Sequence, residues 1–259
     1  MSSKLSLKLN KDRFTDFVAK LQDLTNIEDT IKIKIEKDTT LIYTMLTNEV
    51  SVLALKNFTI KTSDYFENFD RDEMFDFVIT SATKFVKNLK FFNSTTPIKL
   101  DIVYKPMPDD EEVMHIRTAQ FSNGKLKINC IGGEQYKIKD IRKELLEQRL
   151  NLNNSKWSFT ISNSDFLDVK KLSSIHNEDR TLNINVTKGV VTVLENSKWE
   201  LHVDNIESPD NNLTFIKKYL SNIDTTKDEI TFHIFETFIL IKDEQSNLML
   251  SFEQNFEDN

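Results

Sequence analysis

Three lysines are spaced so that a helix would present them to one side. The stretch SATKFVKNLKFF, residues 81–92, contains Lys84, Lys87 and Lys90 but no acidic residue, although the chain carries a formal net charge of -7. At roughly 100° per residue, Lys84 and Lys87 point away from an apolar stripe and Lys90 lies on its flank. That stripe, at spacings typical of a buried helix face, is Ala82, Phe85, Val86 and Leu89. Ammonium groups on an acid-free face suit sequence-independent contact with phosphates, whereas the alternative is an ordinary solvated face.

The same pattern recurs in other segments with helical spacing. We expect helices at 10–24, 164–175 and 211–223, the second preceded by the capping-box spacing of SNSD, residues 162–165. On the last two of these, Lys171 and Lys218 would point outward, with Lys170 and Lys217 beside them. The first helix fits less well, because aspartates take its outer face and Lys20 lies on its side. The recurrence favours a phosphate-binding role over a chance arrangement.

The rest of the chain is dominated by strands. Alternation of polar and apolar residues predicts strands at 31–37, 50–55, 99–104, 125–130, 181–186, 190–194, 230–235 and 248–252. Each helix follows a short strand-like run and precedes about three strands, so one unit is used four times, two per half. The charged segment 137–156 lacks this alternation. We therefore expect an α+β protein with two similar domains, 1–136 and 157–259, joined by a connector at 137–156.

Residue types that could support catalysis are scarce. The four histidines, His115, His176, His202 and His233, show no metal-ligand spacing, and the acidic run at 109–112 reads as a hairpin tip. The single cysteine, Cys130, lies in an apolar strand and excludes an intrachain disulfide. Only four glycines are present, which excludes a glycine-rich phosphate loop. We expect no enzyme activity, no catalytic residue, no metal and no cofactor.

No signal peptide or membrane span is expected either. The N-terminal MSSKLSLKLN alternates polar and apolar residues, and no run approaches 18 apolar residues. With one cysteine, a reducing and therefore intracellular location is expected, which would be the host cytoplasm for a phage protein or the nucleus for a eukaryotic one. Scarce glycine with abundant Asn, Lys, Asp and Ile suggests an AT-rich phage or viral genome.

Four stretches, taken in order, resemble DNA sliding clamps of the proliferating cell nuclear antigen type and their bacteriophage counterparts. FDFVITSATKFVKNLKFF, residues 75–92, resembles that family's second strand-to-helix segment, and NLTFIKKYLSNID, residues 212–224, resembles its fourth-helix segment. MLTNEVSVLAL, residues 45–55, resembles the strand and loop beneath the connector, and NLMLSFEQNFEDN, residues 247–259, the last strand and acidic tail. One departure is the helix-forming composition of IRKELLEQRL in the connector, which is largely extended in the family.

The resemblance implies the DNA-clamp fold, with two helices on antiparallel sheets in each domain, and a ring of three subunits around duplex DNA. The helices would line the hole, and their lysines would touch phosphates without reading sequence. The implied DNA-binding residues are Lys84, Lys87, Lys90, Lys170, Lys171, Lys217, Lys218 and Lys20. The implied function is that of a processivity factor that tethers DNA polymerase and other DNA-processing enzymes and is placed on DNA by a clamp-loader ATPase.

The resemblance also implies two protein-binding surfaces. An apolar pocket beneath the connector would hold short partner peptides, and the matching residues are Met45, Val50, Val52, Leu150, Leu152, Phe252 and Phe256. Subunits would join by pairing the edge strand 124–131 with strand 190–196 of the next copy. Two alternatives remain: a viral processivity factor of clamp fold that does not close a ring, and a β-rich virion structural protein.

Overall fold

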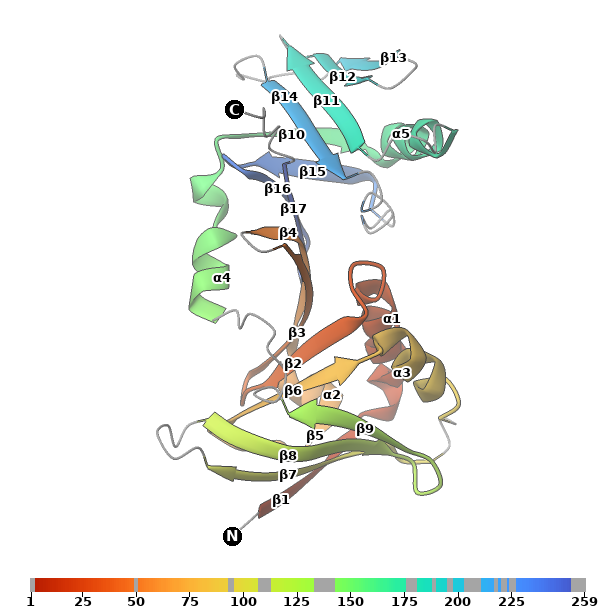
Figure 1. Cartoon of the computed structure of the whole chain (residues 1–259), viewed down its shortest axis with the longest axis vertical. Coiled ribbons are helices and arrows are strands. Elements are labelled where there is room, and N and C mark those ends of the chain that lie inside the picture. Colours follow the sequence, from red (N-terminus) through yellow and green to blue (C-terminus); the bar gives the residue numbers. More distant parts are fainter. Residues whose placement is uncertain are drawn as a thin grey trace. The chain divides into compact units, whose positions relative to one another are not determined.

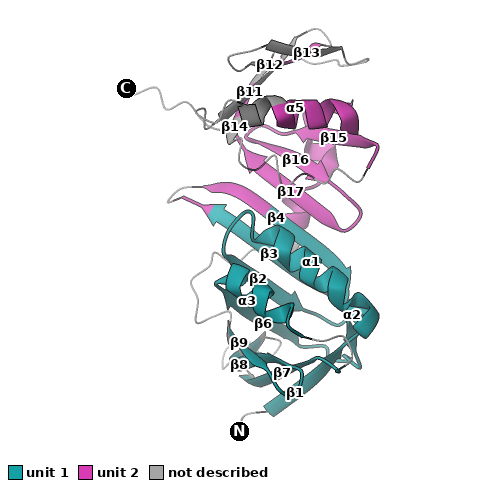
Figure 2. Ribbon diagram, turned by 90° about the vertical axis from the view of Figure 1, so that its right-hand side faces the viewer, with its two compact units in different colours: residues 1–46, 56–140 teal, residues 47–55, 141–259 magenta. Residues whose placement is uncertain are grey.

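The computed structural model describes residues 3–48, 51–92, 96–106, 113–132, 143–175, 181–187, 190–194, 198–202, 211–216, 219, 223 and 227–252. The chain divides into two compact units (Figure 2). Unit 1 contains residues 1–46 and 56–140, and unit 2 contains residues 47–55 and 141–259. Helices and mainly antiparallel strands alternate in both units (Figure 1), which confirms the expected mixed architecture.

Unit 1 is a sheet with two helices on one face. Its strands lie in the order β4-β3-β2-β6-β9-β8-β7-β1-β5. The strands are β1 (Ser3–Leu9), β2 (Thr30–Ile35), β3 (Thr39–Thr47), β4 (Val52–Lys61), β5 (Phe66–Glu67), β6 (Met74–Thr80), β7 (Lys99–Pro106), β8 (Val113–Ser122) and β9 (Lys127–Gly132). The helical elements are η1 (Lys11–Arg13), α1 (Phe14–Leu24), α2 (Thr62–Tyr65) and α3 (Ala82–Leu89). Helices α1 and α3 contact each other, and both match the helices expected at 10–24 and 81–92.

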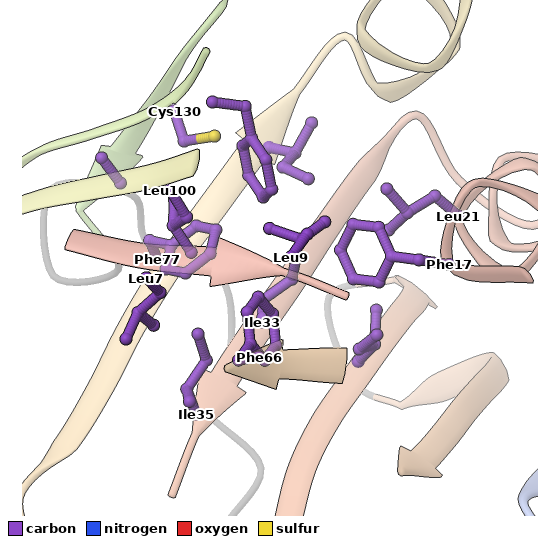
Figure 3. Close-up of a cluster of buried hydrophobic side chains, with 14 of the residues drawn as sticks. Leu7, Leu9, Phe17, Leu21, Ile33, Ile35, Phe66, Phe77, Leu100 and Cys130 are labelled. Atoms are coloured by element: carbon purple, nitrogen blue, oxygen red, sulfur yellow. The ribbon is translucent and has the colours of Figure 1, made fainter. Parts of the chain in front are cut away.

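The core of unit 1 lies between these helices and the sheet. Phe17 of α1 and Phe85 of α3 both pack on Phe121 of β8, with ring centroids 6.1 and 5.5 Å apart. Figure 3 shows Phe17 and Leu21 directed toward side chains of the strands. Cys130 of β9 belongs to the same core, and burial raises the pKa of its thiol, as expected for an inert cysteine.

Unit 2 contains two sheets. Strands β10, β15, β16 and β17 lie in that order, followed by the start of β4, and a second sheet has the order β13-β12-β11-β14. The strands are β10 (Trp157–Ser162), β11 (Thr181–Thr187), β12 (Val190–Leu194), β13 (Lys198–His202), β14 (Asn211–Ile216), β15 (Glu229–Ile234), β16 (Phe238–Lys242) and β17 (Ser246–Ser251). The helical elements are α4 (Lys143–Arg149), η3 (Leu152–Asn154) and α5 (Asn163–Ile175), the last matching the expected helix at 164–175.

Helix α5 starts where the capping spacing placed it. The backbone N–H of Asp165 donates to Ser162 Oγ at 3.1 Å, which satisfies one of the free donors of the first turn. Phe166 then packs on Phe232 of β15, with ring centroids 6.1 Å apart. In the connector, α4 confirms that the helix-forming composition of this segment produces a helix.

The helix expected at 211–223 is wrong over its first part. Residues 211–216 form strand β14, which pairs with β11 in a continuous antiparallel register from Asn211 opposite Val186 to Ile216 opposite Thr181. Leu213 is buried, which is compatible with the spacing of a helix and with that of a strand. The pairing with β11 therefore decides the conformation. Lys217 and Lys218 lie outside the described residues.

Candidate nucleic-acid interface

Helix α3 is anchored at its N-terminus by an acidic residue from another part of unit 1. Asp29, in the turn between α1 and β2, accepts a hydrogen bond from Thr83 N–H through its carboxylate at 2.7 Å. Its carbonyl oxygen accepts from Ala82 N–H at 2.8 Å. Ser81, the residue at the cap position, makes no side-chain cap bond and has a positive φ of 52°. A carboxylate at a helix N-terminus also favours the helix dipole, so Asp29 fixes where α3 begins.

The outer face of α3 is basic and free of acids. Lys84, Lys87 and Lys90 are all exposed, while Phe85, Val86 and Leu89 are buried, as the apolar stripe predicts. Lys90 Nζ donates to Gln22 Oε1 of α1 at 3.3 Å. Among the residues that the structure describes, Lys84 and Lys87 have no carboxylate partner within ion-pair distance. Their ammonium groups therefore remain available to an anion.

The lysines of the other helices are placed differently. Lys171 of α5 is exposed but forms an ion pair with Asp168 at 3.0 Å. Lys170 is half-buried, and its Nζ lies 5.3 Å from the ring centroid of Phe166. Both lie on the same helix, and the carboxylate of Asp168 reduces the net positive charge there. The basic character of α5 is weaker than that of α3.

Lys20 of α1 is bound into a local network. Its Nζ donates to Asp16 Oδ1 at 2.9 Å and lies 5.2 Å from the ring centroid of Phe58. Burial alone would raise the pKa of Asp16, but hydrogen bonds from Tyr65 and Lys20 outweigh it and lower the pKa. Burial and the hydrogen bond to Asp16 in turn raise the pKa of the Tyr65 phenol. This network makes Lys20 a poor phosphate ligand compared with Lys84 and Lys87.

Aspartates on the outer face of α1 are neutralised by basic partners. Asp23 pairs with Lys56 of β4 at 2.6 Å, and the Lys56 side chain is only 5% exposed. Sequence analysis missed Lys56, because its partner lies on a helix more than thirty residues away in the chain. The effect is that α1, although acidic in sequence, adds less negative charge beside the α3 face than its aspartates suggest.

One exposed residue on the α3 face was also missed. Phe91 is 77% exposed and lies four residues after Lys87 and seven after Lys84, which is the spacing of one helix face. That spacing is visible in the sequence, but the neighbouring Phe92 is buried, and only the structure separates the two.

The residues expected to form a partner pocket lie in both units. Met45 and Leu150 are buried, whereas Val52, Leu152 and Phe252 are half-buried. Phe252 is held by its backbone N–H, which donates to Thr237 O at 2.9 Å. Val50 and Phe256 lie outside the described residues. The pocket remains a prediction.

The strand expected at 190–194 is present as β12, but its expected role as a free subunit edge is wrong. Strand β12 pairs with β11 on one side and β13 on the other, so it has no free edge, and β13 is the outer strand of that sheet. The other expected edge is open over most of its length. Strand β9 pairs with β8 at residues 127–130 and with β6 at Ile131 and Gly132, so within the described part of the chain residues 127–130 have no partner strand on the side away from β8.

Other candidate sites receive little support from the described part of the chain. No group of His, Cys, Asp and Glu there could hold a metal ion, and no helix there is long and apolar enough to cross a membrane. His233 is half-buried in β15, where burial and then the charge of Lys242 lower its pKa. The acidic run at 109–112 and His176 lie outside the described residues.

Comparison with solved structures identifies the fold. The chain is similar to proliferating cellular nuclear antigen from Entamoeba histolytica, with a TM-score of 0.58 and 17% sequence identity. The similarity covers 98% of this chain and 100% of that one. The Helicobacter pylori beta clamp bound to a DNA ligase peptide matches with a TM-score of 0.62 and 10% identity, over 98% of this chain and 68% of that one. A chain of the PCNA2–PCNA3 complex from Sulfolobus tokodaii matches with a TM-score of 0.56 and 12% identity, over 98% of this chain and 99% of that one.

These similarities establish the fold at low sequence identity. No protein-family model and no curated protein sequence matches the chain. The chain has the DNA-clamp fold, and it spans the whole length of the Entamoeba protein but about two thirds of the Helicobacter clamp.

Proposed function

We propose that this protein is a DNA sliding clamp, a processivity factor that encircles duplex DNA and tethers a DNA polymerase. The observation that carries the proposal is the outer face of α3, where Lys84 and Lys87 are exposed and have no carboxylate partner among the described residues, in a chain of net charge -7. On a clamp fold, such a face suits weak phosphate contact that does not depend on base sequence.

The ring is supported by a repeat within the chain. Strand β17, the last of unit 2, lies beside the start of β4, where Ser251 Oγ donates to the carbonyl oxygen of Val52. Strand β9 is the corresponding last strand of unit 1, and β13 corresponds to β4, because each is the fourth strand of its unit. Pairing of β9 with β13 of the next copy would repeat the internal arrangement head to tail. We propose that three copies close the ring, each with clamp domains at 1–136 and 157–259.

A proline in β9 tests this assembly. Asn123 N–H donates to Leu126 O, so alternation along the β8–β9 ladder directs the N–H of Asn129 away from β8, toward the open edge. Asn129→Pro therefore removes a donor only from that edge. Native mass spectrometry should give three times 30.3 kDa for the wild type and a single chain for the variant. A wild-type mass of one or two chains would support a clamp-fold processivity factor that does not form a ring.

Polymerase tethering would use the residues expected to form the partner pocket. We propose that Val52, Leu152 and Phe252, which are half-buried, contribute to a site for short apolar peptides, with Met45, Leu150, Val50 and Phe256 as further members. A polymerase held there would reach the primer end at a raised local concentration. Phe252→Ala should abolish polymerase stimulation without changing duplex affinity, and unchanged stimulation would place the site elsewhere. The proposed partners also include a clamp-loader ATPase.

A further inference from the structure

Phe91 places an aromatic ring on the lysine face of α3. After Leu89 the backbone keeps winding, because Phe91 N–H donates to Asn88 O at 3.1 Å and Phe92 N–H to Leu89 O at 2.8 Å. Phe91 therefore stays on the side of Lys84 and Lys87, whereas Phe92 turns into the core with 4% exposure. The face combines two cations, which have no carboxylate partner in the part of the chain that the structure describes, with one ring that is 77% exposed.

An exposed phenyl ring between cations fits a ligand that is both anionic and planar. Phosphates would meet the lysines, and an unstacked base would offer a flat apolar surface to the ring. In a duplex the bases are stacked on one another, so the ring could reach only the sugar edge. Single-stranded DNA meets both requirements.

We propose that Phe91, together with Lys84 and Lys87, contacts an unpaired base, so that this face binds single-stranded DNA where it adjoins the duplex. The inference rests on the proposed DNA contact of the lysine face and adds a second ligand class to it. A clamp with this contact would distinguish a primer–template junction or a gap from continuous duplex.

A second copy of the chain is the rival occupant for an exposed ring. Packing another copy over Phe91 would also bury Lys84 and Lys87, which lie on the same face. In a self-complementary contact α3 would meet α3 of the other copy, which has no acidic residue to compensate for the buried ammonium groups. The charge of the face therefore favours a nucleic acid over an apolar protein surface.

Helix α5 offers a matched control. Leu167 is 39% exposed and lies four residues before Lys171, so it stands beside a lysine much as Phe91 does, but without an aromatic ring. Loss of exposed apolar area alone would affect Leu167→Ala and Phe91→Ala in the same way. Base stacking would affect only Phe91→Ala.

The test measures fluorescence anisotropy of labelled oligo(dT) of about 16 nucleotides and of a blunt duplex of equal length, at one low salt concentration. Phe91→Ala should weaken oligo(dT) binding by about 5- to 150-fold and leave duplex binding within about twofold, while Leu167→Ala changes neither. In Phe91→Trp, oligo(dT) should bind as tightly as to the wild type and quench the added tryptophan emission.

Three results would overturn the inference in distinguishable ways. If Phe91→Ala binds oligo(dT) as the wild type does and duplex binding is also intact, the unpaired-base contact is wrong but the proposed function stands. If the variant instead changes the native mass at unchanged oligo(dT) affinity, Phe91 packs against another copy. If the wild type binds neither DNA, the proposed function itself fails.

Discussion

Removing the Asp29 carboxylate should destabilise α3 without touching its lysines. Asp29→Ala loses the hydrogen bond from Thr83 N–H and the negative charge at the helix N-terminus. A lost capping side chain costs about 1 kcal/mol, and the charge at an exposed helix end about 0.3–1 kcal/mol. We therefore expect Asp29→Ala to lower the stability of α3 by about 1.5 kcal/mol. Asp29→Asn should lose only the smaller charge contribution.

Two assays separate a local effect from a global one. Hydrogen exchange of the α3 amides should speed up by about tenfold, since 1.4 kcal/mol corresponds to that factor, and urea denaturation should show a lower midpoint at an unchanged slope. Ser81→Ala is the control, because Ser81 makes no side-chain cap bond and should change stability by less than about 0.5 kcal/mol. If Ser81→Ala were the more damaging substitution, the assignment of Asp29 as the cap would be refuted.

Three further predictions concern the core, an ion pair and a titratable side chain of the two units. Phe121→Ala should cost about 3–5 kcal/mol in urea denaturation, because Phe121 is fully buried and contacts Phe17, Phe77 and Phe85; a loss under about 1 kcal/mol would contradict the packing described. Lys56→Ala should cost about 2–3 kcal/mol because it leaves Asp23 partly buried without this partner, and Lys56→Ala/Asp23→Ala should recover part of that loss in a double-mutant cycle. The lowered pKa of His233 means that the unfolded chain takes up a proton first, so stability should fall as pH drops below 6.5 toward the folded-state pKa. His233→Gln should flatten that decline, and an unchanged pH profile would count against the pKa shift.

Local periodicity was sufficient for three helices. The apolar stripe of α3 and the stripe and cap of α5 are encoded within a dozen residues each, so their outward lysines could be predicted. The sequence also carries the difference between the two lysine faces, because Asp168 lies three residues before Lys171 while no acid lies three or four residues from Lys84 or Lys87. The structure shows that this spacing produces an ion pair between Lys171 and Asp168.

Long-range pairing decided the features that sequence reasoning missed. Residues 211–216 carry a pattern compatible with a helix but find a partner strand in β11. In β2, alternation predicts the strand correctly, yet Lys32 is 3% exposed because it pairs with Asp76 of β6 at 2.8 Å. The outer strand of the second sheet is β13 and not the expected β12 for a similar reason, because β13 pairs with β12. In each case the deciding residue lies on another strand.

The salt dependence of duplex binding tests the central claim most directly. Lys84→Ala/Lys87→Ala removes two exposed ammonium groups from α3, and Lys4→Ala/Lys8→Ala removes two from β1, so the net charge changes equally. If the α3 face contacts DNA, the first variant should lower the slope of log affinity against log salt by about 1.8 for each chain that touches the duplex. The β1 variant should keep the wild-type slope. Equal slopes for all three proteins would contradict the account.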